Sequence, residues 1–395
     1  MSVHELAFQR SKYKHLSDSE WRWFLQQVEG RERTADKLPT FARIDDWWYP
    51  VRLSCEQCSS EYTARYKAQI VNYTSQQTKG RFIDLTAGYG VDTYFLSEHF
   101  EHTDYVERDP ELCRIAAHNF SLSAHSSSLT VHNTTAEEFF SHNSSHVTGN
   151  RFDLIFADPA RRDSHGGKVF RLEDCTPNIV ELLPTILEHL TPEGRVLLKL
   201  SPMLDITQAI KNLSSITSPL SPLSWDIHIV AIKNEVKEVL LLSGGNGTIT
   251  AIDLGKKDQA FVFTREEESL STERSFDATV FQCNGLYIYE PNASILKAGA
   301  YKLVATRFGL TKLDPNTHLY VSDTLVENFP GRVWKIQSQI TNHKLQITNA
   351  NVLVRNYPLT PEQVKKKLRI HDGGDTYIIG CRIAGKPTLL HAERI

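Results

Sequence analysis

The chain has 395 residues, enough for about two to four domains with hydrophobic cores of their own. Its formal net charge of -3 and pI near 6.6 exclude a protein that is basic overall, so a nucleic-acid-binding surface could only be local. No segment approaches the ~20 consecutive apolar residues that span a membrane, and no apolar run precedes a cleavage site near the first residue. We therefore expect a cytoplasmic protein that does not bind membranes.

The six cysteines are scattered along the chain and predict neither a disulfide framework nor a metal site. Only Cys55 and Cys58 have the spacing of a metal-binding pair, and no second pair completes a set of four ligands. We interpret these two residues as thiols one helical turn apart and expect no bound metal.

Residues 1–78 are predicted to be mostly helical. Ser17-Asp-Ser-Glu20 has the Ser-x-x-Glu pattern that begins a helix, and residues 59–71 form a second helical pattern with tyrosines on one side. Tyrosines next to Arg65 and Lys67 could stack on the bases of a nucleic acid. The alternative is that they attach this segment to the main domain.

A glycine-containing loop follows the first apolar strand pattern, Phe82–Leu85. The loop lacks the third glycine of the dinucleotide-binding GxGxxG motif, because Thr93 occupies that place, and no P-loop Lys-Ser/Thr follows. The pattern that remains is acidic-x-x-x-Gly-x-Gly, from Asp84 through Gly88 to Gly90. It resembles motif I of class I S-adenosylmethionine (SAM) methyltransferases. A plain glycine-containing turn is the alternative.

The resemblance to motif I implies that this loop surrounds the methionine end of SAM. The cofactor carries a sulfonium group and an amino-acid tail but no phosphate, so a carboxylate and an open loop suit it better than a phosphate-binding nest. The cofactor-binding candidates in this stretch are Asp84, Thr86, Ala87, Gly88, Gly90, Asp92 and Thr93.

Strand and helix patterns alternate from Arg81 to about Gly247, which predicts a doubly wound parallel sheet. The last two strand patterns are separated by too few residues for a crossover helix, so we expect them to pair antiparallel. Seven strands with a terminal antiparallel hairpin are typical of class I methyltransferases. The predicted strands are Phe82–Leu85, Asp104–Glu107, Leu129–His132, Phe152–Ala157, Arg195–Leu200, Trp225–Ile232 and Val239–Ser243.

Two further segments are candidates for binding the nucleoside part of SAM. Glu107 ends the second strand, where a carboxylate can accept hydrogen bonds from both ribose hydroxyls, and Arg108 follows it. A solvent-capped strand end is the alternative for Glu107. After the third strand, Thr135 stands where methyltransferases often carry an aspartate for the adenine amino group. The Ala136 amide or Glu137 could contact adenine instead.

The fourth strand ends in Asp158-Pro-Ala-Arg-Arg162, which resembles the Asp-Pro-Pro-aromatic motif of methyltransferases that act on amino groups of bases. In that motif the Asp side chain and a backbone carbonyl held by proline orient the acceptor nitrogen. Arg161 replaces the aromatic residue and could stack on a base or hold a phosphate or carboxylate. A simple turn is the alternative. The catalytic candidates are Asp158, Pro159, Arg161 and Arg162, Asp158 also counts as cofactor-binding, and Lys199 and Ser201 are possible substrate contacts.

The pattern changes near Thr248, where a small α/β unit and a basic C-terminal segment begin. The polar run Thr264–Ser275 is expected to be a solvated loop. Residues 321–395 hold eleven Lys/Arg and six Asp/Glu, a net charge of +5, and the basic residues concentrate in Lys365–Arg369, with Arg332, Lys335 and Arg355 nearby in sequence. This segment suits contact with a phosphate backbone, and an ordinary solvated helix face is the alternative.

Taken together, the chain resembles bacterial class I SAM-dependent methyltransferases that carry a C-terminal THUMP-like domain. The resemblance lies in Asp84–Asp92, Asp158–Asp163 with Arg171–Asp174, and Val354–Pro358 with His371–Gly374. It implies a helical region at residues 1–78 and a Rossmann-like seven-stranded methyltransferase domain at 79–247. A ferredoxin-like domain at 248–319 and a THUMP-like α/β domain at 320–395 would follow. THUMP domains bind RNA in tRNA- and rRNA-modifying enzymes.

We therefore expect a SAM-dependent enzyme that methylates a base nitrogen of tRNA or rRNA. The alternatives are a methyltransferase that acts on protein or a small molecule, and an RNA-binding protein with a decayed catalytic site. The sequence leaves the target nucleotide, the methylated atom and the oligomeric state open.

Overall fold

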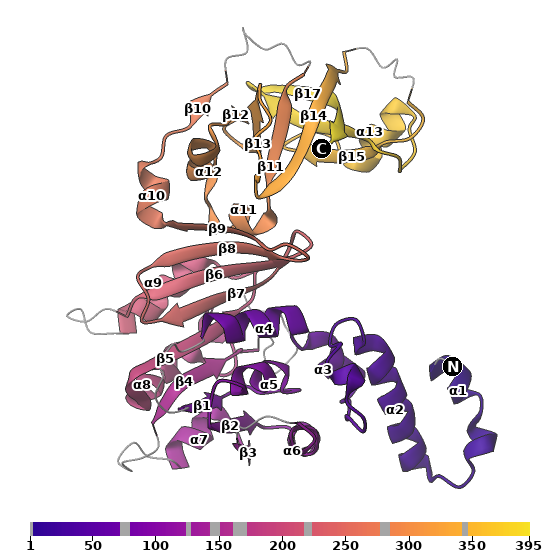
Figure 1. Ribbon diagram of the computed structural model, residues 1–395, viewed down its shortest axis with the longest axis vertical. Coiled ribbons are helices and arrows are strands. Elements are labelled where there is room, and N and C mark those ends of the chain that lie inside the picture. The colour runs from indigo at the N-terminus through magenta and orange to yellow at the C-terminus, as the bar shows by residue number, and fades with distance from the viewer. Residues whose placement is uncertain are drawn as a thin grey trace. The chain divides into compact units, whose positions relative to one another are not determined.

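The computed structural model describes residues 3–71, 80–123, 128–142, 151–160, 172–216, 223–276, 285–341 and 347–395. The chain forms two compact units (Figure 1). The first consists of residues 1–226 and 238–246, and the second of residues 227–237 and 247–395. None of the helices in these ranges is both long enough and apolar enough to cross a lipid bilayer.

The N-terminal part of the first unit is helical, as predicted. Helix α2 begins with the expected capping box, in which the Ser17 hydroxyl accepts from the Glu20 amide and the Glu20 carboxylate accepts from the Ser17 amide. Phe41 stacks on Trp47 at 4.2 Å, and the Trp47 indole donates to the hydroxyl of Tyr89 at 2.9 Å. These contacts attach the N-terminal segment to the predicted glycine loop. The helices are α1 (Val3–Ala7), α2 (Asp18–Thr34), α3 (Arg52–Gln57) and α4 (Glu61–Ile70), with 3-10 turns at Arg10–Tyr13 and Phe41–Arg43.

The first unit contains a sheet whose strands follow the order β3-β2-β1-β4-β5-β7. All neighbours pair in parallel except β5 and β7, which are antiparallel. This is the predicted Rossmann-like arrangement of the class I methyltransferase fold. The strands are β1 (Arg81–Asp84), β2 (His102–Glu107), β3 (Ser128–Asn133), β4 (Phe152–Ala157), β5 (Leu190–Leu200) and β7 (Glu235–Ser243). The helices are α5 (Val91–Ser97), α6 (Pro110–Ser121), α7 (Ala136–His142), α8 (Ile179–Glu188) and α9 (Ile206–Ile216), with a 3-10 turn at Leu172–Asp174.

A two-residue turn joins β6 (Trp225–Ile232) to β7. Its residues, Lys233 and Asn234, have φ values of 52° and 62°, which is the backbone of a tight antiparallel hairpin, as predicted. In the second unit, β6 also pairs in parallel with β8 (Thr248–Leu254), and β8 pairs antiparallel with β9 (Gln259–Thr264).

The acidic run after β9 is a helix, so the prediction of a solvated loop is wrong. Helix α10 (Arg265–Leu270) begins with a capping box between Thr264 and Glu267. The Glu268 carboxylate accepts hydrogen bonds of 2.9–3.2 Å from the backbone amides of residues 301–303, the first turn of α12 (Tyr301–Phe308). A carboxylate is favourable at that end of a helix because unpaired amides and the positive end of the helix dipole meet there.

One mixed sheet runs through the rest of the second unit, in the order β10-β12-β13-β11-β14-β17-β16-β15. Its strands are β10 (Arg274–Ser275), β11 (Tyr287–Pro291), β12 (Thr311–Asp314), β13 (Thr317–Ser322), β14 (Gly331–Gln339), β15 (Asn351–Arg355), β16 (Thr376–Ile383) and β17 (Lys386–Arg394). The remaining helices are α11 (Ala293–Ala298) and α13 (Pro361–Leu368).

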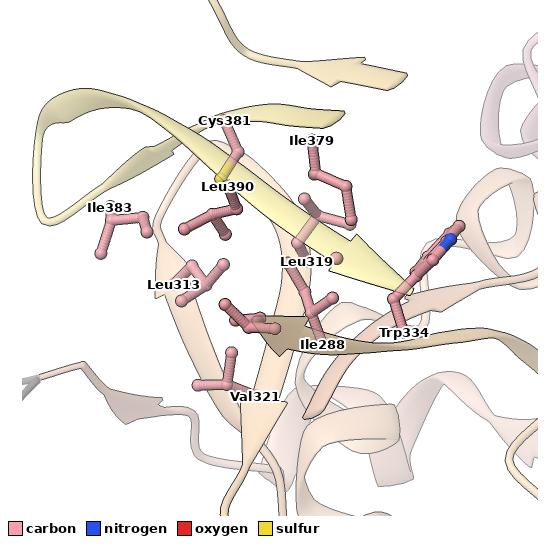
Figure 2. Close-up of a cluster of buried hydrophobic side chains, with 11 residues drawn as sticks. Ile288, Leu313, Leu319, Val321, Trp334, Ile379, Cys381, Ile383 and Leu390 are labelled. Carbon is pink, nitrogen blue, oxygen red and sulfur yellow. The ribbon is translucent and has the colours of Figure 1, made fainter. Parts of the chain in front are cut away.

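One hydrophobic core cluster of the second unit lies on one face of this sheet. Figure 2 shows labelled side chains of β11, β12, β13, β14, β16 and β17 meeting there, and alternate residues such as Ile379, Cys381 and Ile383 belong to the same cluster. On the other face, Ile378 and Leu389 pack with residues of α13. Apolar side chains that alternate along β16 and β17 therefore contribute to both faces of the sheet, and the apolar side of α13 covers one of them.

Candidate active site

A cavity of about 310 Å³ opens at the carboxyl ends of β1, β2 and β4, where ligands bind in open α/β sheets. Most of the predicted cofactor residues line it: Asp84, Thr86, Ala87, Gly88, Gly90, Asp92, Glu107, Arg108, Thr135, Ala136 and Asp158. Two predicted residues, Thr93 and Pro159, are buried and are not part of the lining. The sequence motifs therefore meet at one site although they are up to 74 residues apart.

The loop of motif I depends on glycine at its two predicted positions. Gly88 and Gly90 have φ values of 57° and 81°, in the left-handed backbone region that residues other than glycine rarely adopt. A Cβ atom at Gly90 would also lie 3.3 Å from the Tyr105 ring. Gly90 is the N-cap of α5, and the Tyr105 hydroxyl donates to the Gly88 carbonyl. The backbone therefore turns sharply and leaves the cavity open above it.

Asp84 lies beneath this loop and is almost fully buried. Its carboxylate accepts hydrogen bonds from the Thr93 hydroxyl at 2.6 Å and from the Thr86 amide at 3.0 Å. Burial raises the pKa of Asp84 to about 7, against the opposing effect of these two donors. Thr93 thus supports Asp84 from behind the cavity.

Glu107 connects the end of β2 to the glycine loop. One carboxylate oxygen accepts from the Gly88 amide at 2.9 Å, and the other accepts from the Asp109 amide at 2.8 Å. Two backbone donors therefore fix the carboxylate at the cavity wall. Thr135, Ala136 and Glu137, at the start of α7, line the adenine end that the sequence predicts.

Asp158 follows β4 at the cavity and is held there by two side chains. Its backbone amide donates to the Thr86 hydroxyl at 2.7 Å, and the Lys199 ammonium donates to its Oδ2 at 2.5 Å. Among the described residues no donor to Asp158 Oδ1 is found, and the side chain is 39% exposed. Arg161 and Arg162, the other catalytic candidates, lie outside the described residues. Ser201 does not line the cavity.

A buried group of charges lies behind Asp158. Asp92 accepts from the Ser59 hydroxyl at 2.6 Å and lies 3.3 Å from Lys67 Nζ and 3.6 Å from Lys199 Nζ. Lys67 is completely buried and also contacts Glu238 at 2.5 Å.

These neighbours shift the pKa values of the group. Burial alone would raise the pKa of Asp92, but the two lysines lower it below its usual range. Burial would lower the pKa of Lys199, but Asp158 and Asp92 raise it above the ordinary value.

Sequence reasoning missed the contribution of the N-terminal region to this site. Ser54, Gln57, Cys58 and Ser59 line the cavity, and Lys67 reaches the charges behind it. A lysine on the apolar side of a helical pattern is the signal that could have identified Lys67, because such a residue requires a buried anion. Its partner Glu238 lies 171 residues away in the sequence.

The absence of a bound metal stays a prediction. Within the part of the chain that the structure describes, no group of three or more His, Cys, Asp or Glu side chains could hold a metal ion. Burial raises the pKa of the Cys55 thiol to about 12 and also raises that of Cys58, so both remain protonated.

The predicted basic surface of the C-terminal segment is smaller than its sequence suggests. Arg332 and Arg355 both bind the buried carboxylate of Glu290, and the Lys365 ammonium binds Asp372 at 2.8 Å. The cations of α13 and its C-cap that remain exposed are Lys366, Lys367 and Arg369.

Known protein families and proteins resemble this chain in sequence and structure. Residues 287–330 match the model of a ferredoxin-like domain, and residues 331–394 match the model of a THUMP domain-like family. A crystal structure from Porphyromonas gingivalis W83, solved as a candidate methyltransferase, is 29% identical, with a TM-score of 0.80. It covers 96% of this chain and 92% of its own. Two proteins of Mycobacterium tuberculosis, from strains CDC 1551 / Oshkosh and H37Rv, are named uncharacterized S-adenosylmethionine-dependent methyltransferases. Each is 22% identical over 93% of this chain and 94% of its own length.

The chain is a SAM-dependent methyltransferase with ferredoxin-like and THUMP-like C-terminal domains. The predicted enzyme class, cofactor and fold are thereby confirmed. The two matched C-terminal domains of this methyltransferase share one sheet, since β11 of the first pairs with β14 of the second. The residue boundaries predicted for the four regions stay predictions.

Proposed function

We propose that this methyltransferase transfers the methyl group of SAM to a nitrogen of a base in tRNA or rRNA. The observation that carries the proposal is the position of Asp158. Its carboxylate stands at the end of the cavity that the motif I loop and Glu107 also line, with one oxygen held by Lys199. An acceptor amine bound there would lie beside the cofactor.

The cofactor would occupy the cavity in a defined direction. Asp84 and the loop at Gly88 and Gly90 would surround the methionine end, because the buried carboxylate can pair with an ammonium group. Glu107 would bind the ribose hydroxyls, and the start of α7 would border the adenine. This order leaves the sulfonium near Asp158, which is where a methyl group has to be for transfer.

Positioning would supply most of the catalysis. In the transfer, the nitrogen lone pair forms a bond to the methyl carbon while the carbon–sulfur bond breaks, and the nitrogen then loses a proton. Asp158 Oδ1, which receives no hydrogen bond from a described residue, can accept one from an acceptor N–H and direct the lone pair at the methyl group. A carboxylate also stabilises the positive charge that develops on the nitrogen.

RNA is proposed as the acceptor because the C-terminal segment matches a THUMP-like family and exposes Lys366, Lys367 and Arg369. Exposed cations on one helix suit a phosphate backbone. Arg332 and Arg355 already pair with Glu290, so the proposal does not rely on them for phosphate contact.

The test is transfer of labelled methyl groups from SAM to RNA, and separately to protein, both extracted from cells that lack this enzyme. Label is expected in RNA, at a rate at least about 100-fold lower with Asp158→Ala, because the acceptor nitrogen loses its orienting group. Glu235→Gln, at the exposed start of β7, serves as the matched control and should leave the rate unchanged. Label in protein alone would reject RNA as the substrate. Equal rates for Asp158→Ala and the wild type would reject the catalytic assignment.

A further inference from the structure

We propose that Lys199 is the positioning residue of the active site, which fixes the Asp158 carboxylate in the orientation that receives the acceptor. The inference rests on the proposed role of Asp158 in binding the acceptor. It assigns to Lys199 a role different from the substrate contact that the sequence suggested.

The surroundings of Lys199 leave its ammonium little freedom. The side chain extends from the end of β5 and is only 14% exposed. Its Nζ atom lies 2.5 Å from Asp158 Oδ2 and 3.6 Å from Asp92 Oδ2. An ammonium held between two carboxylates in a largely buried place is fixed by both of them. It is therefore poorly suited to move with a substrate.

Lys199 lies closer to Asp158 than to Asp92 because of the groups that surround Asp92. Asp92 already receives the hydroxyl of Ser59 and lies close to the buried ammonium of Lys67. Because the Ser59 hydroxyl already binds the Asp92 oxygen that Lys199 approaches, Lys199 makes its shorter contact with Asp158. Lys67 is in turn held by Glu238, so the N-terminal helix α4 contributes to the placement of a carboxylate at the end of β4.

The ion pair also determines which oxygen of Asp158 faces the acceptor. Lys199 occupies Oδ2, and Oδ1 receives no hydrogen bond within the described ranges. Without Lys199 the carboxylate could rotate about its terminal torsion, which is broad for aspartate. The acceptor would then meet a mobile group, and turnover would fall although the cofactor still binds.

The experiment combines Lys199→Met, Lys199→Arg and Asp158→Ala in a double-mutant cycle. It measures kcat, KM and the SAM dissociation constant with the acceptor class that takes up label. Lys199→Met should lower kcat about 10- to 100-fold and change SAM affinity less than about twofold, and Lys199→Arg should recover part of kcat. In the Asp158→Ala background, Lys199→Met should add less than about a twofold loss, because the residues act as one unit. Lys237→Met, an exposed lysine paired with Glu235, is the control.

Two results would overturn the proposal. Losses that multiply in the double variant would mean that Lys199 does not act through Asp158. A SAM affinity that falls as much as kcat would make Lys199 a cofactor contact.

Crystal structures of the wild type and of Lys199→Met provide a readout that needs no acceptor. They should show the Asp158 carboxylate ordered in the first and rotated or disordered in the second. An unchanged carboxylate would contradict the proposal even if RNA proves not to be the substrate.

Discussion

Both units bury a carboxylate between two cations, but they do so in different ways. In the first unit, Asp92 and both of its lysines are enclosed, with Lys67 completely buried. In the second unit, Glu290 is 2% exposed while Arg332 and Arg355 are 30% and 41% exposed. The Glu290 cluster thus connects strands at the surface, where the arginines keep part of their hydration. The lysine cluster has given up nearly all of its hydration, and it lies next to a cavity.

This difference indicates what each cluster does for the protein. Enclosing charges is costly, and apolar residues of the same size often stabilise a fold as well or better. A cluster that is retained beside a ligand cavity is best explained by the geometry it imposes on that cavity. The arginine cluster joins β11, β14 and β15, which belong to both of the matched C-terminal domains, and its role is to connect them.

The largest effect is expected when one member of the enclosed cluster is removed. Lys67→Met should lower the free energy of unfolding by about 3–5 kcal/mol, because Glu238 would be left buried without its cation and Asp92 would keep only the more distant Lys199. Adding Glu238→Gln should restore part of the loss. Denaturant unfolding of the full chain measures both, with Lys237→Met as the exposed control. A loss below about 1 kcal/mol for Lys67→Met would contradict the enclosed nature of the cluster.

The arginine cluster should be less sensitive. Glu290→Gln should cost about 1–3 kcal/mol, since the amide can still accept a hydrogen bond and the arginines can turn to water. The same unfolding experiment measures the change, and Glu327→Gln, on an exposed loop, provides the matched control. A loss as large as that of Lys67→Met would remove the distinction between the two clusters.

The pH dependence of SAM binding tests the role of the buried Asp84 carboxylate in the first unit. The pKa of Asp84 is raised to about 7, so the group is mostly protonated at pH 6 and mostly ionised at pH 8. Only the ionised form pairs with the ammonium of SAM, so affinity should rise up to about tenfold over this range. Calorimetric titrations of the wild type and of Asp84→Asn would measure it. The variant should bind weakly at both pH values, and an equal rise in both proteins would assign the effect to another group.

The smallest effect concerns the exposed cations of α13. Replacing Lys366 and Lys367 with alanine should weaken RNA binding and make it less dependent on salt. The slope of log K against log salt concentration should become shallower by about 0.7–0.9 for each phosphate that is no longer neutralised. Lys365→Ala is the matched comparison, because its ammonium is already bound to Asp372 and should contribute less. Salt-dependent binding curves with structured RNA provide the measurement. An unchanged slope in the double variant would remove α13 from the RNA surface.

Much of the fold could be predicted because it depends on local patterns. Apolar runs indicated the strands, Ser17 and Glu20 indicated a helix start, and the glycines of motif I marked a backbone that other residues rarely adopt. The acidic run at residues 265–270 was misjudged, because its capping of α12 depends on residues more than thirty positions away. Patterns within one segment do not reveal partners brought together only by folding.

The residues of the candidate site also fall into those that the sequence could predict and those that it could not. Asp84, Glu107 and Asp158 could be identified because each ends a strand at the same edge of a parallel sheet. The role of Lys67 and the ion pair of Lys199 with Asp158 could not, since both depend on packing between distant segments.

The most direct test of the proposed site is the affinity for SAM of two variants at residues that line the cavity, one at the end of β2 and one directly after β4. Glu107→Ala should weaken SAM binding about 10- to 100-fold, as expected for loss of a hydrogen bond to a charged group, and Asp158→Ala should leave it within about twofold. Glu107→Gln, which keeps an acceptor for the Gly88 amide, would separate loss of the ribose contact from collapse of the loop. Unchanged affinity in Glu107→Ala, or an equal loss in Asp158→Ala, would contradict the proposed division of the cavity into a cofactor end and a catalytic end.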